Sequence, residues 1–152
     1  MPQPTLPARI GLGLLMTLPA CNTGAEKAEA RAILRAVDEL VQAPAGAKAE
    51  PHARLEVAMC SEKSVCGLRD VCVDAFRPLA VNELLQAEIH ARIAAASSPS
   101  ARPSASSPAD SLPPLDVLQQ RLAQSDSDVK SAGPNIENCL RAAVEVRRAR
   151  GL

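Results

Sequence analysis

Five cysteines are the residues of this 152-residue chain whose possible chemistry depends most on their spacing. They are Cys21, Cys60, Cys66, Cys72 and Cys139. Closed zinc sites favour cysteine pairs with about two to four residues between them, whereas three of these cysteines recur every six residues. A thiol oxidoreductase would place a Cys-x-x-Cys motif at a helix start, and the sequence has none. The spacing therefore favours disulfide bonds.

Helical geometry limits how the last four cysteines can pair. If Cys66 and Cys72 lie on one helix, their Cα atoms are about 10 Å apart, and a disulfide tolerates at most about 7 Å. Pairing Cys60 with Cys72 would require Cys60 to reach across the helix start to a residue well inside it. We therefore predict the disulfides Cys60–Cys66 and Cys72–Cys139, with Cys72 and Cys139 on the inward faces of two packed helices.

The remaining residues that could do chemistry form no recognisable site. His52 and His90 are isolated, and we expect both to be solvated surface residues rather than ligands or general bases. Asp126-Ser-Asp128 begins like a calcium loop, but Lys130 occupies the third ligand position and the downstream Glu is missing. The sequence predicts no catalytic residue, no cofactor and no metal site, and therefore no enzyme.

The first residues have the pattern of a secretory signal. The uncharged apolar run over 10–18 follows Arg9 and would rise only about 14 Å as a helix, well short of the ~30 Å hydrocarbon core. It leads into Leu18-Pro19-Ala20-Cys21, which resembles the lipobox of bacterial lipoprotein precursors, a family that usually has a small residue where Pro19 stands. We interpret 1–20 as a signal peptide and 21–24 as a lipidated tether.

The lipobox resemblance implies a lipid modification and a location. Cys21 would receive a thioether-linked diacylglycerol, and the chain would be cut before it and acylated at its new N-terminus, which makes the lipid bilayer its partner. Asn22 is not the Asp that retains some lipoproteins at the inner membrane, so the outer membrane is favoured. Lipidation of Cys21 also leaves four cysteines, an even number that suits an oxidising compartment.

Composition and periodicity predict an all-α fold. Aromatic residues make up 1% of the chain, with no Trp or Tyr, whereas sandwiches and barrels favour aromatic and β-branched residues. The formal net charge is zero, which gives no electrostatic basis for binding nucleic acid. We expect a small antiparallel helical bundle or helical hairpin, tied by the two disulfides, over 25–152.

Apolar periodicity places the helices. The first is predicted over 25–43, with a capping box at Thr23 and Glu26. Its inward residues are Ile33, Val37, Leu40 and Val41. A loop over 44–52 and a short helical turn over 53–59 follow. The longest helix is predicted over 65–96, kinked at Pro78. Its first inward residues are Leu68, Val71, Cys72, Ala75 and Leu79.

The second half of the chain begins with a segment that cannot build a core. Residues 97–114 hold seven serines and five prolines, which indicates a flexible, disordered linker. A helix is predicted from Leu115, a turn at Gly133-Pro134, and a last helix from about Asn135. The inward residues of that helix are expected to be Ile136, Cys139, Leu140 and Ala143. Its terminal basic residues complement the helix dipole; they are Arg147, Arg148 and Arg150.

These observations favour a lipid-anchored cell-envelope protein with a structural or interaction role. One alternative is a periplasm-facing thiol or redox protein that uses Cys60 or Cys66 as a reactive thiol. Another is a module that binds a small apolar ligand between its helices.

Overall fold

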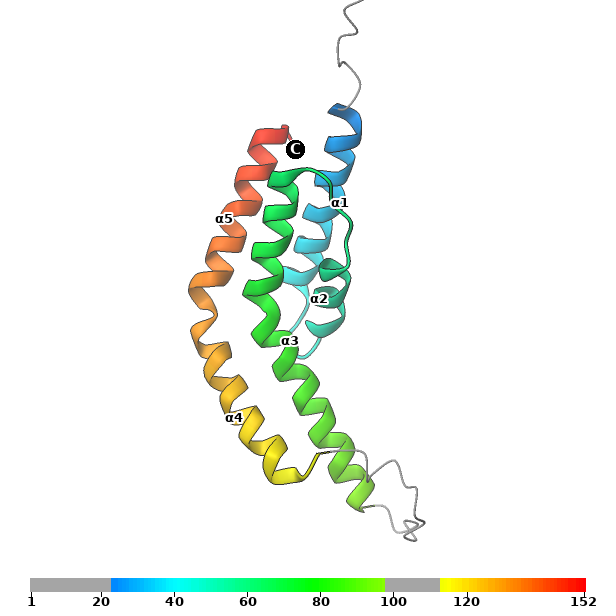
Figure 1. The fold of residues 1–152 in the computed structure, drawn as a ribbon, viewed down its shortest axis with the longest axis vertical. Coiled ribbons are helices and arrows are strands. Elements are labelled where there is room, and N and C mark those ends of the chain that lie inside the picture. Colours follow the sequence, from blue (N-terminus) through cyan, green and yellow to red (C-terminus); the bar gives the residue numbers. More distant parts are fainter. Residues whose placement is uncertain (1–22, 98–112) are drawn as a thin grey trace, which may run out of the picture.

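The structure, a computed structural model, describes residues 23–97 and 113–152, and these ranges are helical without a strand (Figure 1). The elements are α1 (Thr23–Gln42), α2 (Ala49–Glu56), α3 (Lys63–Ser97), α4 (Leu115–Ser131) and α5 (Gly133–Arg150). The predicted all-α bundle is confirmed. The predicted signal peptide, Cys21 and most of the predicted linker lie outside the described residues.

The long helix α3 is the element against which the other four pack (Figure 1). Only Ala132 separates α4 from α5, and the two helices follow each other along α3 in the opposite direction. α5 lies beside the N-terminal half of α3 and α4 beside its C-terminal half. Because α1 and α2 pack on the N-terminal half, the molecule consists of a helical bundle that continues into a two-helix arm.

The core lies where α1, α2, α3 and α5 meet. Its fully or nearly fully buried side chains are spaced three or four residues apart on each helix, which places them on one face. They include Ile33, Val37 and Leu40 of α1, Leu55 of α2, Leu68, Cys72, Ala75 and Phe76 of α3, and Cys139, Ala143 and Val146 of α5. The predicted inward faces of α1 and of the first part of α3 are confirmed; Val41, Val71 and Leu79 are partly buried at the edge of this core.

Pro78 lies inside α3 without ending it, as predicted for a kinked helix. A proline has no amide hydrogen and its ring crowds the carbonyl of the preceding turn. The axis of α3 changes direction near its middle (Figure 1). The bend coincides with the change from the bundle to the two-helix arm.

The predicted loop over 44–52 holds for 44–48, and the helical turn predicted over 53–59 belongs to α2, which begins earlier, at Ala49, and ends at Glu56. Glu83 of α3 accepts hydrogen bonds from the backbone N–H of Lys48 (2.6 Å) and Ala49 (3.1 Å). A carboxylate from another helix thus satisfies the free N–H groups at the α2 start. Pro51 stands in the first turn, where its missing N–H costs no intrahelical bond.

Two predictions for the last helix also need correction. Gly133 and Pro134 are its first residues rather than a separate turn, since a proline is well tolerated at a helix start. Leu140 is 41% exposed and Val146 is buried. The inward face follows Cys139, Ala143 and Val146, and Leu140 is rotated by about 100° from Cys139. Ile136 is partly buried against the core, as expected for an inward position.

Candidate functional site

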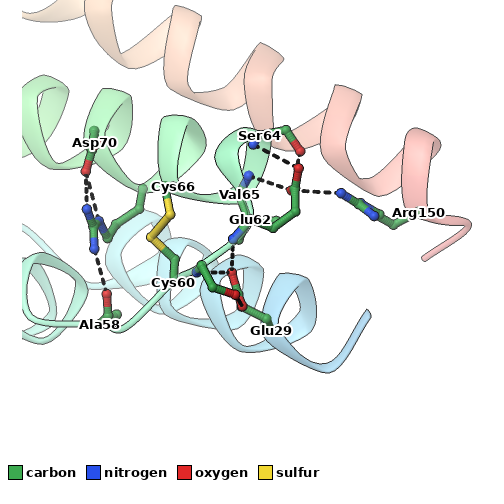
Figure 2. Close-up of a disulfide and its surroundings, with 11 residues drawn as sticks. Glu29, Ala58, Cys60, Glu62, Ser64, Val65, Cys66, Asp70 and Arg150 are labelled. Carbon is green, nitrogen blue, oxygen red and sulfur yellow. Dashed lines mark hydrogen bonds and ion pairs between the residues drawn. A yellow bond between two sulfur atoms is a disulfide. The ribbon is translucent and has the colours of Figure 1, made fainter. Parts of the chain in front are cut away.

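Two disulfides join the described cysteines in the predicted pairs. Cys72–Cys139 links α3 to α5 with a Cα–Cα distance of 4.8 Å, and both residues are fully buried. Cys60–Cys66 links the loop before α3 to the first turn of that helix, at 5.5 Å (Figure 2). Because all four sulfurs are bonded, a zinc ligand or a nucleophilic thiolate would require reduction of one of these bonds.

Glu62 caps α3 next to the partly buried Cys60–Cys66 disulfide. Its carboxylate accepts hydrogen bonds from the backbone N–H of Ser64 (3.1 Å) and Val65 (3.0 Å), and from the Ser64 hydroxyl (Figure 2). The Ser64 hydroxyl, the two backbone donors and the nearby Arg150 guanidinium lower the pKa of Glu62 to about 2. The cap is therefore ionised under all but strongly acidic conditions.

Glu29 of α1 fixes the loop that the Cys60–Cys66 disulfide closes. Its carboxylate accepts hydrogen bonds from the backbone N–H of Ser61 (2.7 Å) and Glu62 (3.0 Å) and from the Ser61 hydroxyl (2.6 Å). The Glu62 N–H makes the largest contribution to lowering the pKa of Glu29, followed by the Ser61 donors. An anion of α1 thus orders the chain immediately before α3.

Arg150 connects three helices at this end of the bundle. Its guanidinium lies 2.7 Å from the Glu62 carboxylate and 3.2 Å from that of Glu26 in the first turn of α1. Glu26, one of the two residues of the predicted capping box, thus pairs with Arg150; the side chain of Thr23, the other one, lies outside the described part of the structure. The ion pairs hold the start of α1, the start of α3 and the end of α5 together.

Lys48 forms a second polar site, at the other end of α1. Its ammonium donates hydrogen bonds to the carbonyl oxygens of Leu40 (2.8 Å) and Val41 (2.9 Å). The Leu40 carbonyl has no intrahelical donor, since the residue four positions later is Pro44. Lys48 also lies 5.7 Å from the ring centroid of Phe76, and burial lowers the pKa of its ammonium. These contacts indicate a structural cation.

A cavity of about 350 Å³ lies beside Lys48, where α3 bends. Asn82, Glu83 and Gln86 line it, but each already has a hydrogen-bond partner. Glu83 accepts from the α2 start, Gln86 donates to Asn82 at 2.6 Å, and Asn82 donates to Asp126 of α4 at 2.7 Å. The polar groups of this cavity join helices to one another.

His52 is buried, which corrects the expectation of a surface residue. It is 7% exposed, and its Nε2 atom lies 2.9 Å from the carbonyl oxygen of Val73. A carbonyl only accepts, so Nε2 carries the hydrogen. The early start of α2 places His52 on the helix face that packs against α3, three residues before buried Leu55. His90 is exposed, as expected.

The calcium-like Asp126 and Asp128 lie within α4 and are engaged by amides. Asp126 accepts from Asn82, and Asp128 accepts from Gln124 at 3.1 Å. Within 23–97 and 113–152, no group of three or more His, Cys, Asp or Glu side chains could hold a metal ion. Over the same ranges, no helix combines the length and apolar character that a membrane crossing needs.

An apolar groove runs between the first turns of α3 and the last turns of α5. It encloses about 330 Å³ and is lined mainly by small and aliphatic side chains: Gly67, Leu68, Val71, Ala142, Val146 and Ala149. Its volume falls at the lower limit of ligand pockets, about 300 Å³. This groove provides the space between helices that the apolar-ligand alternative requires.

Sequence reasoning missed the cluster of Glu29, Glu62 and Arg150. A Glu directly before a helix start is a local signal for a carboxylate cap. The contact between three segments that are far apart in the chain leaves no such signal.

The helices and the two disulfides define the protein as a disulfide-tied all-α bundle. The chain matches no protein-family model, no curated protein and no solved structure.

Proposed function

We propose that the protein is a lipid-anchored component of the cell envelope, held at the membrane through an acylated Cys21, with a structural or interaction role. The observation that carries the proposal is that disulfide pairing accounts for every cysteine except Cys21. Four of the five form two disulfides, and the one left over is the cysteine of the lipobox-like Leu18-Pro19-Ala20-Cys21. Disulfides persist in oxidising compartments such as the periplasm, and Asn22 favours the outer membrane.

Exposed apolar side chains support the interaction role. Leu140 and Val144 are one turn apart on α5 and are 41% and 52% exposed. Leu84, on the two-helix arm, is 60% exposed. A protein partner could bury such side chains. The described residues hold no metal-ligand cluster and no free thiol, and their polar cavity serves the packing of helices.

Replacement of Cys21 tests the anchoring. Two or more acyl chains attach a protein stably to a membrane, so the wild type should sediment with membranes and carry the mass of a lipidated residue at its mature N-terminus. Cys21→Ser should be soluble or remain an uncleaved precursor. The double variant Cys60→Ser and Cys66→Ser is the matched control and should stay in the membrane fraction. Processing and sedimentation of Cys21→Ser like the wild type would overturn the proposal.

A second candidate function, binding of a small apolar ligand, is favoured by the α3–α5 groove. A Cβ atom built on Gly67 meets no other atom within 4 Å, so Gly67→Leu would place a side chain into open space at the groove. This variant should lose any lipid that co-purifies with the wild type, as measured by solvent extraction and mass spectrometry. Gly24→Leu on α1, which also has open space, should retain it. Wild-type protein free of lipid would exclude this function.

A further inference from the structure

A hollow of about 510 Å³ lies at the end of the bundle where α1 begins and α5 ends. Lys27 of α1 and Arg148 and Arg150 of α5 line it, together with Glu26. Cations from two helices thus border the same hollow. Arginine binds phosphate oxygens through two parallel N–H groups, and lysine binds them as a point charge.

At this end of the bundle the carboxylates have hydrogen-bond or ion-pair partners, whereas two of the basic side chains have none among the described residues. Glu26 and Glu62 share Arg150, and Glu29 accepts hydrogen bonds from the chain before α3. In the part of the chain that the structure describes, neither Lys27 nor Arg148 has a hydrogen bond or ion pair. The carboxylates are therefore engaged in joining the helices, whereas these two cations are available to an anion.

The chain length between Cys21 and α1 places the hollow close to the proposed anchor. Two peptide units of about 3.8 Å each separate the Cα atom of Cys21 from that of Thr23, the first helical residue. Lys27 is four residues further along α1, a rise of about 6 Å. A diacylglycerol on Cys21 would lie at the boundary of the bilayer, so the headgroup layer is within reach of the hollow.

We propose that this end of the bundle docks onto the membrane, with Lys27 and Arg148 binding the phosphate groups of anionic phospholipids around the hollow. The inference rests on the proposed anchoring and adds an orientation to it. The bundle end with the hollow faces the bilayer, and the α3–α4 arm points away from it (Figure 1). The tether keeps the weak headgroup contacts at high effective concentration.

The docking can be measured without relying on lipidation in the cell. In protein that begins at Cys21, is produced without lipidation and has both disulfides intact, Cys21 is the one free thiol and can be coupled to a maleimide phospholipid in vesicles. The chain has no Trp, so one introduced Trp reports its surroundings. Leu152→Trp directly follows Gly151, which lines the hollow, and Leu115→Trp lies at the start of α4 on the arm. The native leucines are 38% and 40% exposed.

In vesicles that contain phosphatidylglycerol and a headgroup-labelled quencher, Leu152→Trp should be quenched and Leu115→Trp should not. The quenching should weaken in pure phosphatidylcholine or at high salt, because salt screens exposed charges. Equal quenching of the two tryptophans, or equal quenching of Leu152→Trp in both kinds of vesicle, would overturn the proposal.

The charge dependence identifies the binding residues. Each basic residue near an anionic surface raises the binding constant about fivefold. The double variant Lys27→Glu with Arg148→Glu should therefore lower the ratio of docked to undocked protein at least ~25-fold. The exposed pair Arg121→Glu with Lys130→Glu on α4 carries the same charge change and should have no effect. The milder Lys27→Gln with Arg148→Gln provides the same test if the first double variant is unfolded. Undiminished docking in a folded variant contradicts the proposal. The chemical tether replaces the acyl chains, so this result is independent of that for Cys21→Ser.

Discussion

The guanidinium of Arg150 lies 2.7 Å from the carboxylate of Glu62, the residue that caps the start of α3. This ion pair joins the last turn of α5 to the first turn of α3, and the same guanidinium also reaches Glu26 of α1. Glu62 lies near the partly buried Cys60–Cys66 disulfide (Figure 2). The end of the bundle nearest to the proposed lipid anchor is therefore stabilised by the Arg150 ion pairs and the Cys60–Cys66 disulfide, in addition to the apolar core.

The first prediction concerns the pH dependence of stability. The pKa of Glu62 falls from an ordinary value of 4.5 to about 2 on folding, so its ionised form stabilises the fold. This contribution is complete above about 4.5 and is lost as the pH falls toward about 2. Glu62→Gln should lower the melting temperature at neutral pH and flatten its decline over this range. Thermal melts monitored by circular dichroism measure both effects.

The control for Glu62 is Glu56→Gln, which removes an exposed carboxylate of α2 that has no partner among the described residues. It should reproduce the wild-type pH profile. A Glu62→Gln profile as steep as that of the wild type would show that this cap does not contribute to the acid sensitivity.

The two disulfides should differ in their contribution to stability. Cys72–Cys139 closes a sequence separation of 67 residues and Cys60–Cys66 one of six. Restriction of the unfolded chain then contributes roughly 4 kcal/mol for the long loop and roughly 2 kcal/mol for the short one. Denaturant unfolding should show a much larger loss for Cys72→Ala with Cys139→Ala than for Cys60→Ala with Cys66→Ala. Equal losses would contradict this ranking.

Peptide mapping of unreduced protein checks the pairing directly. One crosslinked product should join the peptides of Cys72 and Cys139, and Cys60 should be found with Cys66. A fragment that joins Cys60 to Cys72 or Cys139 would contradict the structure.

A third prediction concerns the cation at the end of α1. The Lys48 ammonium donates to the Leu40 carbonyl, which Pro44 leaves without an N–H donor, and to the Val41 carbonyl. Lys48→Met keeps an unbranched side chain near Phe76 but leaves two carbonyl oxygens without this donor, which should cost about 1–3 kcal/mol of unfolding free energy. Lys130→Met, at an exposed site on α4, is the control. A loss no larger than that of the control would show that water replaces the lysine.

The fourth prediction concerns Ser125 of α4, which is 4% exposed and whose hydroxyl has no hydrogen-bond partner in the described residues. Ser125→Ala removes a buried polar group that gains nothing from the fold, and it should stabilise the protein by about 1–3 kcal/mol beyond the effect of helix propensity. Ser127→Ala, exposed on the same helix, measures the propensity effect alone. Equal changes in the two variants would indicate that the Ser125 hydroxyl is hydrated.

Local sequence patterns determined the features that depend on near neighbours. The apolar spacing along α1 and α3 identified their buried faces, because a helix repeats every 3.6 residues whatever it packs against. The pairing of the cysteines followed from the same geometry, since two residues six apart on a helix are too distant to bond. Pro78 was recognised as a kink because its effect is confined to the adjoining turn.

The tertiary structure alone decided the features that depend on distant partners. The start of α2 is set by Glu83, which lies more than thirty residues further along the chain, and this shift buries His52. Leu140 is exposed because only one side of α5 is covered by α3 and α1. The meeting of Glu26, Glu62 and Arg150 likewise depends on how three helices pack. A carboxylate that caps a remote helix has no local signature, because hydrogen bonds depend on distance in space rather than along the chain.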